Sequence, residues 1–293
     1  MGKIIVLGSV NVDLNLNLIN FPNKGETTFS NNFFTSIGGK GYNQAYYCSL
    51  FEKEVLFSCA IGNDEFADLI LKDFDTNKNI KYIIQKNNNV SGSAIILNHE
   101  NDNRIIVNKG SNWDWKAENF KADLIEEGDV ILFQLETPQE ESVKLIKKVR
   151  KNKEVTIFLN PSPSLSFDLT ILENLDFIIL NESETESITK KNPKIAILEC
   201  VDYLLRKGVK NIIITLGAEG CFFANDKVLK KYEAKKIKVK NTVGAGDSFL
   251  GSFISKYHLT KNVDEAIRFA INIASKVCES ENIRLTKKEL EII

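Results

Sequence analysis

The sequence predicts an α/β fold, in which a doubly wound parallel sheet carries helices on both faces and a small β-sheet forms a lid. From residue 130 onward, strand-like apolar runs alternate with segments of helical periodicity, as in parallel sheets covered by helices. Residues 4–7 form a short, continuous apolar run that ends at Gly8, which is typical of a buried parallel strand. Residues 11–18 instead alternate polar and apolar side chains, so they predict a strand with one exposed face.

The other elements follow in chain order. A second half-exposed strand at 27–37 and a hairpin at 91–107, turning at 100–103, complete the predicted lid, whose strands lie near 12–18, 29–37 and 91–108. Helices are expected at 42–51, 66–74, 138–151, 195–207, 247–257 and 263–279, and buried strands at 130–135, 155–159, 177–180 and 211–216. We expect one domain over residues 1–293, with the lid strands inserted in it.

Composition and charge exclude several classes of partner. The 293 residues carry a formal net charge of −1, from 38 basic and 39 acidic side chains, which gives no reason to expect a nucleic-acid or membrane partner. No apolar run is long enough to span a bilayer, and the chain enters a strand at Lys3 rather than a signal peptide. The five cysteines form no Cys-x-x-Cys pair, so we expect a cytoplasmic protein with buried free thiols.

One glycine-rich turn precedes the predicted helix 247–257 and reads Gly244-Ala245-Gly246-Asp247. Successive N–H groups at the start of a helix have no intrahelical acceptor and can bind an anion. Asp247 is then either a helix-capping residue or a base held beside that anion. The turn matches neither the Walker pattern nor the dinucleotide-binding pattern, so the turn alone leaves both interpretations open.

Further polar groups follow glycine-rich turns and strand ends. Residues 38–41 carry three glycines and Lys40 before a predicted helix with Asn43, which indicates either a small-ligand site or a plain turn with a solvated lysine. Three strand ends are followed by Glu136, by residues 181–184 and by residues 215–220. Ligands of parallel sheets bind at the carboxyl ends of strands, so these groups are candidates for one site. For Glu182 we expect the simpler role of a helix N-cap.

Several motifs in register carry a resemblance. They are Gly8-Ser9-Val10-Asn11-Val12-Asp13, Gly38-Gly39-Lys40-Gly41-Tyr42-Asn43-Gln44-Ala45, Phe133-Gln134-Leu135-Glu136-Thr137-Pro138 with Leu159-Asn160-Pro161, Asn181-x-x-Glu184, Thr215-Leu216-Gly217-x-x-Gly220, and Gly244-Ala245-Gly246-Asp247. Over residues 3–280 the chain resembles the ribokinase-like carbohydrate kinases of phosphofructokinase-B type.

The resemblance implies transfer of the γ-phosphoryl group of ATP to a sugar hydroxyl, with D-ribose as the expected sugar and D-ribose 5-phosphate as the product. The positions that match sugar-binding residues of the family are Asn11, Asp13, Gly39, Lys40, Asn43, Glu136 and Asp247. Those that match ATP-binding residues are Asn181, Thr215, Leu216, Gly217, Ala218, Glu219, Gly220, Gly246 and Asn272. Glu184 matches a residue that orients Mg²⁺ through water, Gly244, Ala245 and Gly246 match the anion hole, and Asp247 matches the general base.

Two alternatives stay open at this point. The first is a kinase for another sugar, a phosphosugar or a nucleoside of the same superfamily. A phosphosugar kinase needs extra basic residues near the substrate phosphate, and Lys40 is the one evident candidate. The second is a non-catalytic sugar-binding protein that has kept the fold, against which the intact residues 244–247 argue.

Some residues depart from the family pattern. The resemblance assigns Asn241 and Val243 to a monovalent-cation site, but cation-activated members usually carry Asp where this chain has Asn241, and the loop at 279–285 lacks glycine. We therefore expect weak or absent activation by K⁺ and a retained need for Mg²⁺. Tyr42 is bulkier than the small residue expected beside the sugar. By analogy with the family, we also expect a homodimer formed through the lid.

Overall fold

The computed structural model describes residues 2–99, 102–151, 153–164 and 168–291, and within them the main sheet has nine strands. Their order across the sheet is β13-β12-β11-β10-β9-β8-β1-β4-β5. Strands from β11 to β5 in this order are parallel, whereas β12 pairs antiparallel with both of its neighbours, β11 and β13. The bounds are β1 (Ile4–Leu7), β4 (Val55–Ile61), β5 (Ile80–Lys86), β8 (Val130–Gln134), β9 (Thr156–Asn160), β10 (Phe177–Asn181), β11 (Asn211–Thr215), β12 (Cys221–Ala224) and β13 (Leu229–Tyr232).

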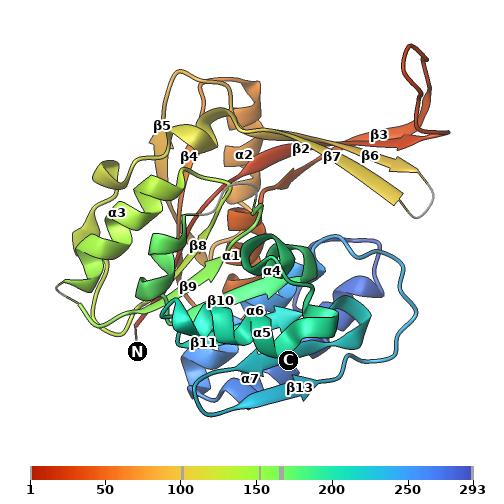
Figure 1. Ribbon diagram of the computed structural model, residues 1–293. Helices are drawn as coiled ribbons and strands as arrows, with labels where there is room; N and C mark the ends of the chain where they lie inside the picture. Colours follow the sequence, from red (N-terminus) through yellow and green to blue (C-terminus); the bar gives the residue numbers. More distant parts are fainter. Residues whose placement is uncertain (1, 100–101, 152, 165–167, 292–293) are drawn as a thin grey trace.

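Helices cover both faces of this sheet, as predicted (Figure 1). Ile4 and Val6 of β1 pack into one core and Ile5 and Leu7 into another, because successive side chains of a strand point to opposite faces. The first core contains α1 (Lys40–Ser49), α2 (Glu65–Phe74), α6 (Ala245–Thr260) and α7 (Val263–Cys278), and the second contains α3 (Gln139–Arg150), α4 (Glu182–Thr189) and α5 (Pro193–Arg206).

Short 3₁₀ turns complete the chain at Gly110–Asp114, Ala117–Asn119, Ala122–Leu124, Leu169–Asn174 and Gly217–Glu219. Across the described ranges, no helix is both long enough and apolar enough to cross a membrane.

The predicted lid is a separate four-stranded sheet that projects from the main body (Figure 1). Its order is β3 (Ser30–Gly38), β2 (Asn11–Leu18), β6 (Ser93–His99) and β7 (Asp102–Asn108). The hairpin predicted at 91–107 is β6–β7, while the central residues of its turn, 100–101, lie outside the described residues. Because β2 follows β1 directly, the lid joins the main sheet at the carboxyl end of β1.

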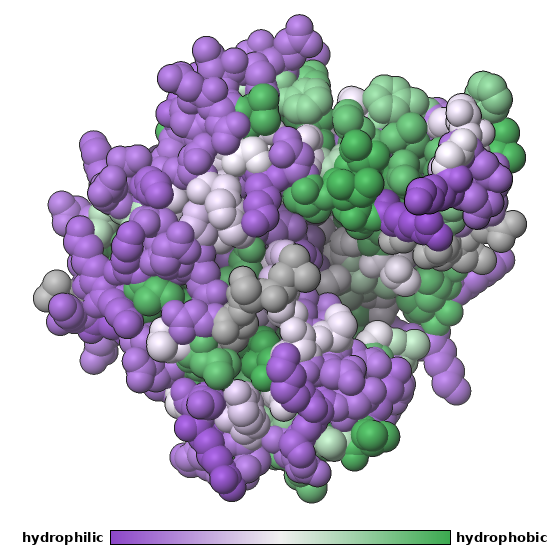
Figure 2. All heavy atoms as spheres, turned by 45° about the horizontal axis from the view of Figure 1, so that its top comes forward, coloured by the Kyte–Doolittle hydropathy of each residue, from purple (hydrophilic) through white to green (hydrophobic). Residues whose placement is uncertain are grey.

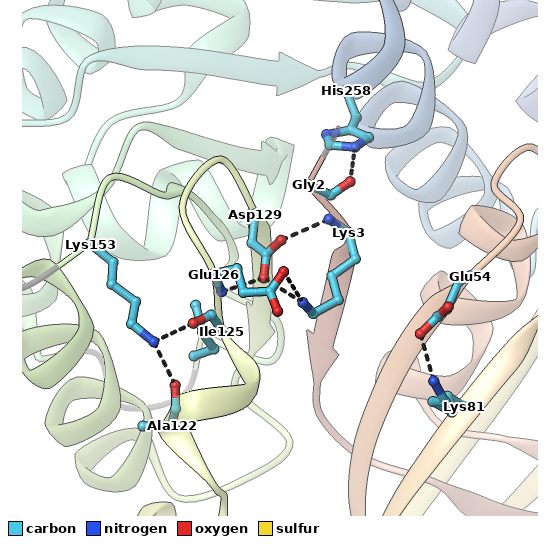
Figure 3. A network of polar contacts seen from close by, with 10 residues as sticks. All are labelled: Gly2, Lys3, Glu54, Lys81, Ala122, Ile125, Glu126, Asp129, Lys153 and His258. Carbon is cyan, nitrogen blue, oxygen red and sulfur yellow. Dashed lines mark hydrogen bonds and ion pairs between the residues drawn. The ribbon is translucent and has the colours of Figure 1, made fainter.

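A polar network ties together the opposite, amino-terminal end of the sheet (Figure 3). The backbone N–H of Lys3 donates to Oδ1 of the buried Asp129 at 2.8 Å, and its ammonium pairs with Glu126 and Asp129 at 3.2 and 3.4 Å. His258 of α6 contacts the carbonyl of Gly2 at 2.7 Å. These charged groups fix the start of β1 far from the carboxyl ends of the strands, and their role is structural.

Several elements were not predicted. The strands β4, β5, β12 and β13 and the helix α4 have no counterpart in the sequence-based assignment. The N-cap expected at Glu182 was wrong: Asn181 is the N-cap of α4, because its shorter side chain accepts from the N–H of Glu184 at 2.8 Å. Glu182 is instead the first helical residue.

Candidate active site

The predicted site residues gather where β1, β8, β10 and β11 end. Helix α1 begins against the end of β1, and this contact requires a glycine. A Cβ atom on Gly41 would lie 2.6 Å from the backbone of Gly8 and Ser9. The absence of that atom lets the start of α1 lie directly beside the strand end.

Glu136 follows β8 and binds this same turn. Its Oε2 accepts from the hydroxyl of Ser9 at 2.5 Å and from the backbone N–H of Lys40 at 3.0 Å. The Ser9 hydroxyl in turn accepts from the N–H of Gly41 at 3.3 Å. Glu136 is thus fixed against the glycine-rich turn that the sequence singled out as a ligand site.

Asn11 and Asp13 approach from β2 of the lid. Asn11 is buried, and its Oδ1 accepts from Asn112 at 2.8 Å, while its own amide N–H groups donate to no described residue. Asp13 is 9% exposed and lies beside Gly38, where an added Cβ atom would come within 2.0 Å of its Oδ2. Gly39, at the N-cap of α1, follows directly. One amide donor and several carboxylate acceptors therefore surround this turn, a set that suits the hydroxyls of a polyol.

Asp247 lies in the first turn of α6, three residues after Gly244, whose φ of 80° is left-handed and favours glycine. Its two carboxylate oxygens are held by consecutive residues of α1: Oδ1 accepts from Gln44 at 2.8 Å and Oδ2 from Asn43 at 3.3 Å. The N–H groups of Gly246 and Asp247 meet no acceptor among the described residues. The arrangement places an oriented carboxylate beside free backbone donors.

Amide side chains extend from Asp247 toward the strand ends, and we call Gln134, Gln44 and Asn160 the amide relay; the first two are fully buried and Asn160 is half-buried. Gln134 donates to Oε1 of Gln44 at 2.7 Å, and Gln44 donates to Oδ1 of Asn160 at 3.1 Å. Asn160 then donates to Oε2 of Glu184 at 3.5 Å. The relay connects Asp247 with Glu184 through Gln44 of α1 and Asn160 of β9, while Gln134 of β8 holds the side chain of Gln44.

Asn181 and Glu184 form a capping box at the start of α4. The N–H of Asn181 donates to Oε2 of Glu184 at 2.9 Å, and the reverse bond closes the box. Oε1 of Glu184 makes no hydrogen bond to a described residue.

The residues predicted to bind the nucleotide lie along a tight loop after the neighbouring strand β11. The Thr215 hydroxyl donates to the carbonyl of Leu180 at 3.2 Å, and Leu216 N–H donates to Gly220 at 2.8 Å. Gly217, Ala218 and Glu219 are exposed on this loop.

Within the described part of the chain, some of the predicted residues make no hydrogen bond with the groups described above. Asn272 lies on α7, where its amide oxygen accepts from Lys235 and from no group of the 215–220 loop in the described chain. Asn241 precedes the Gly244 turn, and its Oδ1 accepts from the N–H of Val243 at 2.9 Å. Tyr42, which is bulkier than the residue expected next to the sugar-binding loop, points into the core, where its ring packs near Phe57 and Phe74.

With this geometry in place, the comparisons with known proteins identify the family. The profile of the pfkB family carbohydrate kinases matches residues 1–289. The chain belongs to the pfkB family of carbohydrate kinases. This finding confirms the predicted family and identifies an ATP-dependent carbohydrate kinase.

Individual relatives agree with the family. A ribokinase of Lactococcus lactis is 34% identical over 277 residues, which cover 92% of this chain and 89% of that protein. A deoxyribokinase of Salmonella typhi is 30% identical over 279 residues, which cover 93% of this chain and 91% of that protein. Among solved structures, a ribokinase from Thermotoga maritima has a TM-score of 0.87 at 28% identity and covers 99% of this chain and 98% of that one. The likeness confirms the predicted fold.

The electrostatics of the kinase centre on its carboxylates. Burial first, and then the charge of Glu136, raise the pKa of Asp13 from 3.8 to about 7, although the guanidinium of Arg284 opposes this. Burial disfavours the charged form of Lys40, but the surrounding carboxylates, led by Asp247 and Glu136, outweigh that effect and raise the pKa of its ammonium group. Lys40 is therefore a permanent positive charge among carboxylates.

Sequence reasoning missed several side chains that hold this site of the kinase. Ser9, Gln44, Gln134 and Asn160 stand inside motifs that carried the resemblance, yet no role was inferred for them. Asn112 lies in the 3₁₀ turn Gly110–Asp114 after the lid, and no pattern in the sequence distinguished it. Its contacts with the backbone of Val10 and with Asn11 arise only from the fold.

Proposed function

We propose that this kinase transfers the γ-phosphoryl group of MgATP to the 5-hydroxyl of D-ribose, giving D-ribose 5-phosphate and ADP. The observation that carries the proposal is the placement of Asp247. Its carboxylate accepts hydrogen bonds from Asn43 and Gln44 of α1, the helix that begins beside the proposed sugar site. It also lies beside the free N–H groups of residues 246 and 247.

Asp247 would accept the proton of the attacking hydroxyl, a contribution of about 10²–10⁴ in rate. Within the proposed anion hole of residues 244–246, a free N–H group such as that of Gly246 would stabilise charge on the transferred phosphoryl group, and one such donor contributes about 10²–10³ in rate. Gln44 fixes Oδ1 of Asp247, while the longer bond from Asn43 to Oδ2 leaves that oxygen the better placed to receive a proton. Asn43 can then turn its amide to the sugar.

The sugar would lie between the lid and the start of α1. The amide of Asn11 would donate to one hydroxyl, while the carboxylates of Asp13 and Glu136 would accept from others. Such a buried polar set rejects acceptors that lack the matching hydroxyls. Gly39 and Lys40 would supply the wall of the pocket, and the Lys40 ammonium would face the incoming phosphates.

The nucleotide would bind along residues 215–220, next to Asn181, and we keep Asn272 as a proposed contact near the adenine. Mg²⁺ prefers carboxylate and water oxygens, and the unbonded Oε1 of Glu184 can accept from a metal-bound water. When bound, Mg²⁺ would neutralise charge on the phosphates of ATP. Glu184 keeps its orientation for this task through the capping box with Asn181.

A second acceptor, 2-deoxy-D-ribose, deserves a direct comparison because a deoxyribokinase is also among the relatives at 30% identity. A phosphosugar is disfavoured by the charges near the pocket. Lys40 already faces several carboxylates, and the neighbouring Arg284 pairs with Asp73 at 3.1 Å. The test is a coupled ADP-release assay with D-ribose, 2-deoxy-D-ribose, D-fructose 6-phosphate and adenosine. The highest kcat/KM with D-ribose supports the proposal, and a higher value with any other acceptor overturns it.

We further propose a homodimer formed by the lids of two subunits. Phe33, Ile95 and Ile106 are 58%, 39% and 60% exposed. The strand register places them on the face opposite Asp13, and Figure 2 shows apolar surface gathered over the lid at the upper right. A second lid would cover this surface. We also propose a cytoplasmic location, because all five cysteines are free thiols.

A further inference from the structure

The segment 282–285, which we call the C-terminal strap, lies directly behind the proposed anion hole. Ile283 packs against Gly244: a Cβ atom on Gly244 would lie 2.5 Å from Cγ2 of Ile283 and 3.2 Å from its carbonyl oxygen. The turn 244–246 therefore packs directly against the strap, so a displacement of the strap would displace the turn.

Helix α1 holds the strap through tyrosine hydroxyls. Tyr47 is fully buried, and its hydroxyl donates to the carbonyl of Ile283 at 2.6 Å and accepts from the N–H of Leu285 at 3.3 Å. The hydroxyl of Tyr46 donates to the carbonyl of Leu285 at 3.3 Å. The same helix carries Asn43 and Gln44, so one rigid element fixes both Asp247 and the wall behind the anion hole.

Arg284 adds a second anchor. Its guanidinium donates to both oxygens of Asp73 in α2, at 3.1 and 3.5 Å, and lies 5.0 Å from the ring centroid of Tyr42. The Tyr42 hydroxyl donates to the same carboxylate at 2.6 Å. Two of the departures from the family pattern, Tyr42 and the glycine-free loop that carries Arg284, thus both bond to Asp73.

The residues around this strap do not fit the monovalent cation that the family resemblance implies. Asn241 is neutral and its Oδ1 already accepts from Val243, while the carbonyl of Ile283 already accepts from Tyr47. A cavity of about 550 Å³ beside the strap is lined by glutamates, but also by the ammonium groups of Lys240 and Lys276.

We propose that Tyr47 and Arg284 are positioning residues that hold the strap against the Gly244 turn, in the place of a bound monovalent cation. The inference rests on the proposed function, because it assigns the strap a role only if residues 244–246 bind the transferred phosphoryl group. Neither side chain would touch substrate. Each would act on kcat through the geometry of the anion hole.

The test compares Tyr47→Phe and Arg284→Met with wild type in K⁺, Na⁺ and tetramethylammonium at fixed ionic strength. Wild type should show equal rates in all three salts. Tyr47→Phe should lower kcat roughly five- to tenfold, the equivalent of one net hydrogen bond, with the KM values for sugar and ATP unchanged. Arg284→Lys should recover part of the kcat lost in Arg284→Met.

The matched control is Tyr232→Phe, which removes a hydroxyl bond of 2.9 Å to Asp264 at the edge strand β13 and should leave kcat within about twofold. If Tyr47→Phe does not fold, Tyr46→Phe removes the weaker bond to the same strap from a half-buried ring and should lower kcat by a smaller factor.

Saturable activation of wild type by K⁺, or an undiminished kcat in the variant that folds, would overturn the inference while leaving the proposed function intact. Failure of wild type to phosphorylate any sugar would instead refute the proposed function.

Discussion

Replacing Asp13 with asparagine should stabilise the ligand-free kinase at neutral and alkaline pH, although it should weaken sugar binding. Burial and then Glu136 raise the pKa of Asp13 from 3.8 to about 7. As the pH rises, the carboxyl group therefore ionises in the unfolded chain near 3.8 but remains protonated in the folded chain until about 7. The free energy of unfolding of wild type therefore falls as the pH rises from about 3.8 to about 7, and ionisation of Asp13 lowers it no further above pH 7. Asparagine has no such titration.

The magnitude follows from the width of that window. At 1.36 kcal/mol per pH unit, the displaced pKa corresponds to at most about 4 kcal/mol, of which roughly 2–3 kcal/mol falls between pH 5 and pH 8. A change of 1 kcal/mol moves the Tm of a chain of this size by about 2–4 °C. The Tm of Asp13→Asn relative to wild type should therefore rise by roughly 4–12 °C from pH 5 to pH 8.

The assay is scanning calorimetry of both ligand-free proteins over this pH range at fixed ionic strength. Asp226→Asn is the matched control, since Asp226 is exposed in the turn between β12 and β13 and its variant should follow wild type at every pH. Calorimetric titration with the sugar should show that Asp13→Asn binds more weakly, by roughly 1–3 kcal/mol. A Tm difference that is constant with pH, or that favours wild type as the pH rises, would refute the reasoning.

Two further predictions concern the amide relay and the lid. Gln44→Met removes the donor to Oδ1 of Asp247 and should lower kcat by about 10–100-fold through misorientation of the carboxylate, with the Kd for ADP unchanged; an unaltered kcat would exclude the relay from catalysis. Phe33→Glu should convert the proposed dimer to a monomer in light scattering, whereas Ile195→Glu, at an 88% exposed site on α5, should not; equal masses for both variants would argue against a lid interface.

Much of the fold could be predicted from local patterns. The apolar run of β1 and the polar alternation of β2 each reflect how many faces of the strand are buried. The strand β4 escaped prediction because its seven buried residues have no alternation and match a buried helix equally well. The edge strand β13 carries two lysines in four residues, and only its pairing with β12 makes it a strand.

The site was predictable in part for a different reason. Glycine-rich turns and polar strand ends are local signals, and the fold brings many of them to one edge of the sheet. The amide relay has no such signal, since Gln44, Gln134 and Asn160 meet across three elements. The orientation of Tyr42 also escaped prediction, because a helix start gives no indication of which side chain turns into the core.

The central claim is that Asp247 is the general base of an ATP-dependent sugar kinase. The measurement that tests it most directly is the rate of ADP release with D-ribose and ATP for Asp247→Asn and wild type, together with calorimetric binding of ATP to both. The account predicts a rate lowered by about 10²–10⁴ with nearly unchanged ATP binding and fold. An Asp247→Asn enzyme that keeps more than about a tenth of the wild-type rate would contradict it.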